Sequence, residues 1–366
     1  MGNKKVLVAM SGGVDSSVAA FLLKEQGYGV TGVFMKVWDK KEKDVFAGPA
    51  CYSPEGKDIG DAKEVADMLG IDLTVIDLSR EYNKVVLDYF RREYLKGRTP
   101  NPCVICNRFI KFGLLFEKAV AGGRDFDFFA TGHYAVAEYS REGKRYVLKK
   151  GRDADKDQSY FLFLLTQKQL SKLIFPLGPY TKKDIRAIAR RNNFPVSEKE
   201  ESQDFISGNK DLVFTDKSEE GDVVDTKGNL IGRHRGIIYY TIGQRKGLGI
   251  AGGKPLYVVE IDARNNIIML GPEQDLYRKE LIVSDVHFSG MQKPDSPVEC
   301  EVKIRYRHAA ARAVVYPESE GKARVVFDNP LRAITPGQAA VFYSKDLLLG
   351  GGFIERVLQE KGNSVP

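Results

Sequence analysis

The chain has 366 residues, of which 43% are hydrophobic and 29% are charged; this composition favours neither a disordered nor a membrane protein, and the length suits two or three domains rather than one core. No apolar run approaches the roughly 18 residues of a membrane-spanning helix, and the N-terminus lacks the pattern of a signal peptide, so we expect a cytoplasmic protein with no membrane part. The net charge of +7 at pH 7 favours a polyanionic partner.

The first part of the chain alternates strand and helix patterns. Residues 4–10 form a short apolar run that is typical of a strand buried in a parallel sheet. A Gly-rich turn follows at 11–13, and from Val14 to Gly27 the apolar residues recur at helical spacing. Further strands and helices then alternate over Val30–Val37, Ile59–Leu69, Leu73–Leu78, Arg80–Leu95 and Phe126–Thr131. This order predicts an α/β fold with a doubly wound, mostly parallel sheet.

Strand patterns dominate the rest of the chain. A hairpin is expected around Glu142-Gly143 and a helix from about Thr181. From Val298 to Arg307 apolar and charged residues alternate, which predicts a half-buried strand with Arg305 on its polar face. We therefore expect a nucleotide-binding α/β domain over residues 1–205, a small β-rich central domain over 206–274 and a C-terminal β-barrel over 275–360.

The segment Ser11–Ser16 joins the first predicted strand to the first predicted helix. Backbone N–H groups and the positive end of the helix dipole favour phosphate at such a junction. The hydroxyls of Ser11 and Ser16 add donors, and Asp15 is a candidate Mg²⁺ ligand. No Gly-Lys-Ser/Thr follows, so the loop is not a Walker A motif. For the two glycines alone, a tight structural turn remains the alternative.

The whole string from Ser11 to Ser16, Ser-Gly-Gly-Val-Asp-Ser, resembles the pyrophosphate loop (PP-loop) of the N-type ATP pyrophosphatase superfamily. The resemblance implies that ATP is cleaved between its α and β phosphates and that adenylate is transferred to a substrate oxygen. Several unlike synthetases share this loop, so the choice among them depends on other motifs.

A second distinctive segment is Gly97–Arg108, which contains Cys103-x-x-Cys106 after two prolines. Proline restricts its own backbone and that of the residue before it, so the cysteines follow a rigid approach. Buried packing or half of a zinc site are the alternatives, although no second Cys/His pair has zinc-ribbon spacing.

This segment resembles the catalytic loop of the bacterial tRNA-specific 2-thiouridylase family, and the resemblance extends along nearly the whole chain. It implies that Cys106 is the nucleophile and that Asn101, Pro102 and Cys103 contact the target base. The string Tyr240–Leu248 also matches a hallmark of the family.

The resemblance assigns the remaining site residues to two groups. Expected ATP contacts are Ala9, Met10, Ser11, Gly12, Gly13, Val14, Asp15, Ser16, Met35 and Gly132. Further expected tRNA contacts are His133, Asp157, Gln158, Ser159, Arg305, Tyr306 and Gln338. For His133 alone, a structural histidine is the favoured reading.

The chain departs from the family at Glu201–Ile206, where the second catalytic cysteine, the persulfide carrier, is missing. Cys300 does not replace it, because the strand phase predicts a buried, inert thiol. Two accounts stay open. Cys106 and Cys103 form a redox pair as catalytic residues, or Cys51, Cys103 and Cys106 bind a [4Fe-4S] cluster that carries the sulfur.

The sequence as a whole predicts a tRNA-uridine 2-sulfurtransferase that uses ATP and Mg²⁺. It would adenylate the C2 oxygen of a wobble uridine, with Asp15 in the catalytic machinery, and then replace that oxygen by sulfur. The sulfur would come from a donor protein or from inorganic sulfide. The alternatives are another PP-loop adenylating enzyme and a non-catalytic iron–sulfur RNA-binding protein.

Overall fold

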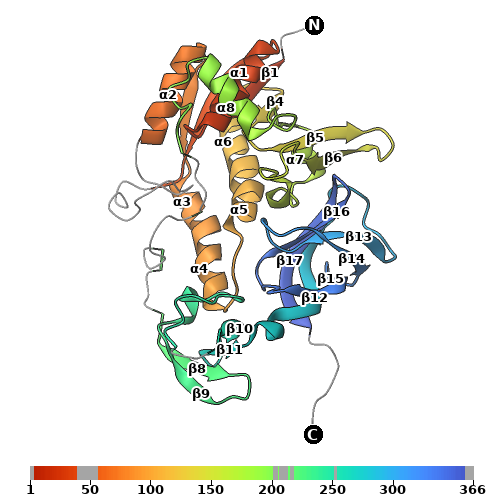
Figure 1. Ribbon diagram of the computed structural model, residues 1–366. Helices are drawn as coiled ribbons and strands as arrows, with labels where there is room; N and C mark the ends of the chain where they lie inside the picture. The colour runs from red at the N-terminus through yellow and green to blue at the C-terminus, as the bar shows by residue number, and fades with distance from the viewer. Residues whose placement is uncertain are drawn as a thin grey trace. The chain divides into compact units, whose positions relative to one another are not determined.

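The computed structural model describes residues 4–38, 57–200, 205, 213–214, 218–250 and 254–358 (Figure 1). They form two compact units. Unit 1 comprises the described residues of 1–86, 103–209 and 346–348. Unit 2 comprises those of 87–102, 210–345 and 349–366.

Unit 1 contains a parallel sheet with the strand order β3-β2-β1-β4-β7. Every pairing in this sheet is parallel. The strands are β1 (Lys5–Ala9), β2 (Gly29–Lys36), β3 (Leu73–Asp77), β4 (Phe128–Ala130) and β7 (Leu173–Ile174). The predicted α/β fold with a doubly wound parallel sheet is confirmed, although β4 is shorter than the predicted strand Phe126–Thr131.

Helices connect these strands. They are α1 (Val14–Glu25), α2 (Lys57–Leu69), α3 (Ser79–Tyr82), α5 (Pro102–Ile105), a π-helical stretch (Cys106–Leu114), α6 (Leu115–Ala121), α7 (Gln167–Leu170) and α8 (Lys182–Arg191). Helix α8 begins at the predicted place because Thr181 and Asp184 form a capping box. It packs beside α1, where the rings of Phe21 and Phe194 meet edge to face with 5.8 Å between centroids (Figure 1).

The expected hairpin is present in unit 1 as β5 (Ala135–Ser140) and β6 (Arg145–Lys150). Leu347 and Leu348, at the start of a later strand, pair with β6. The predicted helix Arg80–Leu95 is interrupted: α3 is followed by a π-helical stretch (Asn83–Leu87) and then by α4 (Asp88–Leu95). Helix α4 belongs to unit 2.

Unit 2 contains two β structures. The smaller sheet has the order β10-β11-β8-β9, from β8 (Gly221–Asp225), β9 (Leu230–His234), β10 (Tyr257–Asp262) and β11 (Ile267–Gly271). The larger one contains β12 (Tyr277–His287), β13 (Val298–Lys303), β14 (Ala311–Pro317), β15 (Ala323–Arg332), β16 (Ala339–Ser344) and β17 (Leu347–Leu358). Because β12 pairs with both β15 and β17, the larger sheet closes into the expected barrel.

Strand β13 ends at Lys303, four residues before the predicted end at Arg307. Ile304 is buried as the alternation required, but Arg305 and Tyr306 lie in the turn that follows. Within the parts of the chain that the structure describes, no helix is long and apolar enough to cross a membrane.

Candidate active site

The PP-loop lies between β1 and α1, as expected. The hydroxyl of Ser16 accepts from the Ser11 amide at 3.1 Å and donates to the Gly13 carbonyl at 3.1 Å. The hydroxyl of Ser17 also donates to the Gly13 carbonyl, at 2.9 Å. These bonds fold the loop back over the first turn of α1, and the first N–H groups of a helix, which lack intrahelical partners, generally favour an anion.

Two glycines of the site are required by close backbone approaches. Gly12 has φ +74°, and a Cβ there would lie 2.2 Å from the carbonyl oxygen of Asp58. At Gly132 a Cβ would lie 2.8 Å from the carbonyl carbon of Asp15 and from the Ser16 amide nitrogen. Gly132 therefore lies directly against the N-terminus of α1, which is consistent with its predicted place beside ATP.

The other predicted ATP contacts lie on the strands that carry the loop. Ala9 is half-buried at the end of β1, and Met10 is buried with its amide bonded to the Val33 carbonyl at 2.8 Å. Met35 is half-buried near the end of β2. All three occupy the carboxyl edge of the parallel sheet, where open α/β folds bind ligands.

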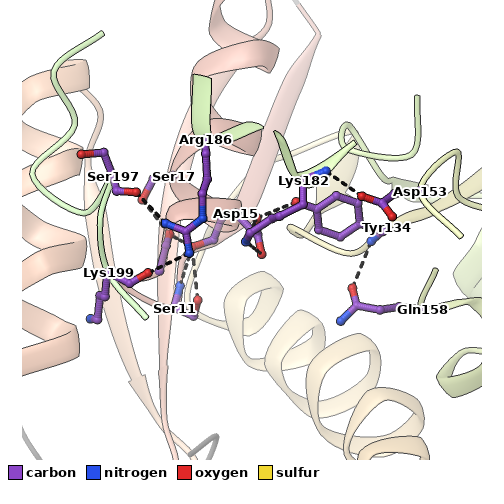
Figure 2. Close-up of polar contacts among 12 residues, drawn as sticks. Ser11, Asp15, Ser17, Tyr134, Asp153, Gln158, Lys182, Arg186, Ser197 and Lys199 are labelled. Atoms are coloured by element: carbon purple, nitrogen blue, oxygen red, sulfur yellow. Dashed lines mark hydrogen bonds and ion pairs between the residues drawn. The ribbon is translucent and has the colours of Figure 1, made fainter. Parts of the chain in front are cut away.

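Asp15 is held by a lysine that the sequence did not point to. Figure 2 shows Nζ of Lys182, from the first turn of α8, against both carboxylate oxygens of Asp15, at 2.7 and 2.8 Å. The hydroxyl of Tyr134 donates to Asp15 Oδ1 at 2.7 Å. The side chain of Lys182 is only 11% exposed. A largely desolvated cation is thus paired with the carboxylate of the PP-loop.

A second lysine is bonded to the loop backbone. Nζ of Lys199 donates to the Gly12 carbonyl at 3.0 Å and pairs with Asp58 at 2.6 Å and with Asp61. Burial lowers the pKa of Lys199, but the two carboxylates outweigh burial and leave that pKa raised, so the lysine stays charged. The guanidinium of Arg186 donates to the Ser197 and Lys199 carbonyls at 2.8 and 3.2 Å (Figure 2). Residues 197–199 are thereby fixed against the PP-loop.

The two cysteines of the Cys103-x-x-Cys106 motif lie at a helix junction in unit 1. Cys103 is half-buried on α5, and Cys106 is buried at the first position of the π-helical stretch. Irregular π turns are frequent at functional sites. The amide of Gln169 satisfies carbonyls of this stretch, donating to Phe112 at 2.8 Å and to Arg108 at 3.1 Å. The described cysteines, Cys103, Cys106 and Cys300, form no disulfide with one another.

His133 is enclosed rather than open to solvent. Its Nδ1 lies 2.7 Å from the Thr131 hydroxyl, and the rings of Phe112 and Phe175 lie 5.7 and 6.0 Å from it, centroid to centroid. Burial, together with the charge of Lys111, holds the pKa of His133 well below its ordinary value, so the imidazole is neutral.

We expect this neutral histidine to make the stability of the fold depend on pH. Because the folded pKa lies below the unfolded value of about 6.5, protonation favours the unfolded chain, and stability is lost as the pH falls below 6.5. Between pH 7.5 and 5.5, the free energy of unfolding of the wild type should drop by about 1 kcal/mol more than that of His133→Gln. Urea denaturation at the two pH values measures this; parallel changes in the two proteins would contradict a buried neutral imidazole.

The predicted tRNA contacts at 157–159 are mostly turned inward. The Asp157 carboxylate accepts from the Gly151 and Ser159 amides and from the Ser159 hydroxyl, at 3.0, 3.1 and 2.9 Å. Asp157 and Ser159 are buried. Gln158 is half-buried and accepts from the Tyr134 amide at 3.0 Å. This turn therefore supports Tyr134, which contacts Asp15.

Arg305 and Gln338 of unit 2 bond to their own unit. Nη2 of Arg305 donates to the Ile242 and Ala333 carbonyls at 3.1 Å and also to the Thr335 hydroxyl. Gln338 donates to the backbone of the segment before Asn101. Tyr306 is half-buried, and Nζ of Lys303 lies 5.5 Å from its ring centroid.

Comparison with known proteins places the chain in a family. The sequence matches the models of a tRNA methyl transferase HUP domain over residues 4–207, a tRNA methyl transferase PRC-barrel domain over 213–272 and an aminomethyltransferase beta-barrel domain over 278–354. It is 48% identical over 363 residues to the tRNA-specific 2-thiouridylase MnmA of Acetivibrio thermocellus, covering 97% of this chain and 100% of that protein. This chain belongs to the tRNA-specific 2-thiouridylase family.

Other relatives extend the match. The 2-thiouridylase MnmA 1 of Caldanaerobacter subterraneus subsp. tengcongensis is 49% identical, covering 97% of this chain and 98% of its own. That of Clostridium botulinum is 47% identical, covering 96% and 99%. Among solved structures, a 4-thiouridine synthetase–RNA complex with bound ATP is 16% identical with a TM-score of 0.36, covering 56% of this chain and 46% of that one. So weak a structural likeness supports no functional statement.

As a 2-thiouridylase family member, the chain raises the question of metal ligands. Cys51 lies outside the described residues, and so does most of the departing segment Glu201–Ile206. Among the residues that the structure does describe, no group of three His, Cys, Asp or Glu side chains is arranged to hold a metal ion. Cys300 is half-buried, not fully buried as the strand phase predicted, but partial burial, aided by the charge of Glu301, raises the pKa of its thiol to about 12, as expected of an inert thiol.

Lys182, Lys199 and Tyr134 are the site residues that sequence reasoning missed. One signal was available for Lys182. It occupies the first turn of a helix, where the positive end of the dipole disfavours a cation, so a lysine there implies an anionic neighbour. Nothing in the sequence connects Lys199 to a loop some 187 residues away, because that contact depends on how α8 packs beside α1.

Proposed function

We propose that this chain is an ATP-dependent tRNA-uridine 2-sulfurtransferase. It adenylates the C2 oxygen of a wobble uridine, replaces that oxygen by sulfur and releases AMP and pyrophosphate. The observation that carries the proposal is the PP-loop on a β1–α1 junction with the cation of Lys182 paired to its Asp15, in a chain nearly half identical to 2-thiouridylases over its length.

The first step needs the phosphates of ATP to be bound and their charge offset. The N-terminal N–H groups of α1 and the hydroxyl of Ser11, which lies 3.2 Å from that of Ser16, would donate to the leaving pyrophosphate. Lys182 already contacts Asp15 and would bond to a phosphate oxygen at the same place. The uridine C2 oxygen then attacks the α phosphorus; an O–P bond forms, the bond between the α and β phosphates breaks, and pyrophosphate leaves.

Mg²⁺ fits this site through Asp15. The ion commonly binds through one or two carboxylates together with substrate phosphates, and Asp15 lies in the loop with a side chain that is 29% exposed. When bound, Mg²⁺ would neutralise phosphate charge. Because Lys182 pairs with both oxygens of Asp15 in this structure, the lysine supplies part of that neutralisation itself.

The second step transfers sulfur, and Cys106 is the proposed nucleophile. Its outer persulfide sulfur, loaded by a donor protein, attacks C2 of the adenylated base. The thiolate of Cys103 then attacks the Cys106 sulfur. A Cys103–Cys106 disulfide forms, the sulfur stays on C2 with the electron pair of the broken S–S bond, and AMP leaves with the former uridine oxygen. A reductant must reopen the disulfide after each turnover.

The [4Fe-4S] account remains the alternative for this step. Cys51, Cys103 and Cys106 would hold the cluster, which would supply a site for the transferred sulfur, taken in that case from inorganic sulfide. The structure describes Cys103 and Cys106 on one helical stretch, which suits two ligands of one centre. Cys51→Ser separates the accounts, because only the cluster account requires the Cys51 thiolate.

The proposed division of labour follows three segments. Residues 1–205 would bind ATP and adenylate, and residues 206–274 and 275–360 would bind tRNA. Contacts to tRNA are proposed for Asn101, Pro102, Cys103, Gln158 and Tyr306, and the buried His133 would support that surface rather than touch the RNA. Asp157 and Ser159, being buried, would support that surface from beneath.

Purified protein tests the proposal directly. Incubated with ATP, a sulfur source and unmodified tRNA, it should form 2-thiouridine, seen by mass spectrometry of nucleosides, with one AMP per thiolated base. Pyrophosphate release that proceeds equally well without tRNA would point instead to a small-molecule adenylating enzyme. No pyrophosphate release with any tRNA would point to a non-catalytic protein.

The affinity for tRNA should fall steeply with salt. Each neutralised phosphate releases a condensed counterion, and the net charge of +7 favours several such contacts. Four or more contacts in the anticodon loop predict a slope of about −3 or steeper in a plot of log affinity against log salt concentration. Filter binding measures this slope between about 50 and 300 mM KCl. An affinity that is indifferent to salt would rule out the polyanionic substrate.

A further inference from the structure

The segment that leads into the cysteine loop is bonded to the C-terminal barrel at successive residues. Nε2 of Gln338 donates to the Thr99 carbonyl at 3.0 Å and to the Pro100 carbonyl at 3.1 Å. The Thr99 amide in turn donates to the Pro336 carbonyl at 2.9 Å. All of these residues lie within unit 2.

These bonds supply hydrogen-bond donors that the proline-containing segment lacks. Pro100 and Pro102 have no N–H group, so this stretch cannot complete a helix or a strand ladder with its own backbone. Pro100 and Asn101 are nevertheless buried, and buried carbonyls require donors from elsewhere. A glutamine amide has two N–H donors, and Gln338 directs them to two consecutive carbonyls.

Gln338 is itself rigidly placed. The backbone carbonyl of Gln338 accepts from the backbone amide of Ile354 at 2.8 Å, and the Gly337 amide donates to the Ile354 carbonyl at 2.8 Å. A Cβ at Gly337, where φ is +90°, would lie 2.7 Å from the Thr99 carbonyl oxygen. The turn before β16 and the strand β17 thus pack closely against the backbone of Thr99.

The central β structure contacts the same stretch. The hydroxyls of Thr99 and Thr241 are 3.2 Å apart, and a Cβ at Gly97 would lie 2.9 Å from the side chain of Ile261. The backbone carbonyl of Thr335 accepts from the backbone amide of Gln338 at 3.2 Å. The hydroxyl of Thr335 accepts a hydrogen bond from the guanidinium of Arg305. The hydrogen bonds therefore continue from Arg305 through Thr335 and Gln338 to Thr99.

We propose that Gln338 is a positioning residue for the cysteine loop. It fixes the backbone of Thr99 and Pro100, and so sets where Asn101, Pro102 and Cys103 begin; it acts on the reaction through this loop and not by holding tRNA. The catalytic part of the proposal rests on the proposed thiouridylase function. The placement itself rests only on the contacts above.

Substitution of Gln338 should therefore lower kcat while leaving the Kd for tRNA nearly unchanged. Without the two N–H donors, the carbonyls of Thr99 and Pro100 lose their partners and the segment can shift. A misplacement of about 1 Å in a positioning element can cost about 100-fold in rate. We therefore expect kcat for thiolation to fall about 10- to 100-fold in Gln338→Glu and in Gln338→Ala, while Kd for tRNA changes less than about two-fold.

Hydrogen–deuterium exchange gives a readout that is independent of activity. In both variants the peptide covering residues 97–106 should take up deuterium faster, because the Thr99 amide lies on the loosened stretch. Peptides of β13 and β14 should exchange as in the wild type, which also shows that the barrel is folded. Gln274→Glu, an exposed site in the same unit, is the control for the change of charge.

The outcomes separate the two roles of Gln338. Faster exchange over 97–106 with a reduced kcat and unchanged Kd supports positioning. A Kd raised about ten-fold or more with unchanged exchange and kcat makes Gln338 a tRNA contact and overturns the proposal. If the wild type forms no thiouridine, the proposed function fails, and the exchange arm alone decides the placement: unchanged exchange overturns it.

Discussion

Lys182→Met is expected to lower the rate of tRNA-dependent pyrophosphate release by about 1,000-fold. Methionine preserves most of the length of the side chain but removes the charge that pairs with Asp15 at 2.7 Å. Losing one preorganised group that stabilises developing charge typically costs about 100- to 1,000-fold in kcat. Lys182 should fall at the upper end because it is largely desolvated and because its loss also leaves Asp15 to repel the phosphates.

Lys183→Met is the matched control. It removes the same charge one residue along the same helix, from an exposed side chain, and should leave the rate within about two-fold. Thermal unfolding of both variants checks that α8 is intact. If Lys182→Met keeps more than a tenth of the wild-type rate while Lys183→Met behaves normally, Lys182 has no role in adenylation.

Cys106→Ser is expected to abolish 2-thiouridine formation while leaving adenylation in place. Serine cannot carry a persulfide or ligate iron, so both accounts of sulfur transfer predict a loss of at least about 1,000-fold, beyond the effect of most positioning residues. The PP-loop is unchanged, so a burst of pyrophosphate stoichiometric with tRNA should persist in a rapid-quench experiment. Thiouridine formation near the wild-type rate would remove Cys106 from the mechanism.

Two further cysteine variants serve as a control and as a test between the two routes of sulfur transfer. Cys300→Ser should be fully active, because the half-buried thiol of Cys300 has a pKa of about 12 and does not ionise near neutral pH. Cys51→Ser decides the route. Full thiolation by an iron-free protein supports the Cys103–Cys106 disulfide, whereas loss of activity together with iron, after anaerobic purification, supports the cluster.

The strands and helices of unit 1 could be predicted because local signals agreed with the fold. The apolar run of β1, the glycine turn and the helical spacing of α1 all indicate the same junction. The Thr181–Asp184 capping box likewise marked the start of α8. The end of β13 could not be predicted, because the alternation continues to Arg307 while the backbone turns after Lys303. Contacts of Arg305 with Ala333 and Thr335, far away in sequence, accompany that turn.

The residues of the site likewise fall into those that the sequence could predict and those that it could not. Ser11–Ser16 and Cys103–Cys106 are contiguous motifs, and the sequence displays them whole. Lys182 and Gln338 act across 167 and 239 residues, and their partners are set by packing, which no local pattern encodes. The burial of His133 agrees with the structural role that the sequence favours for it alone, whereas the burial of Asp157 could not be derived, since polar side chains are buried only where the fold provides partners.

The central claim is that the C2 oxygen of uridine is adenylated, and an isotope experiment tests it most directly. A tRNA carrying ¹⁸O at C2 of its wobble uridine is incubated with the protein, ATP and a sulfur source, and the products are examined by mass spectrometry. The mechanism predicts that AMP gains the label, that pyrophosphate carries none, and that the thiolated base has lost it. Unlabelled AMP alongside newly formed 2-thiouridine would contradict the account.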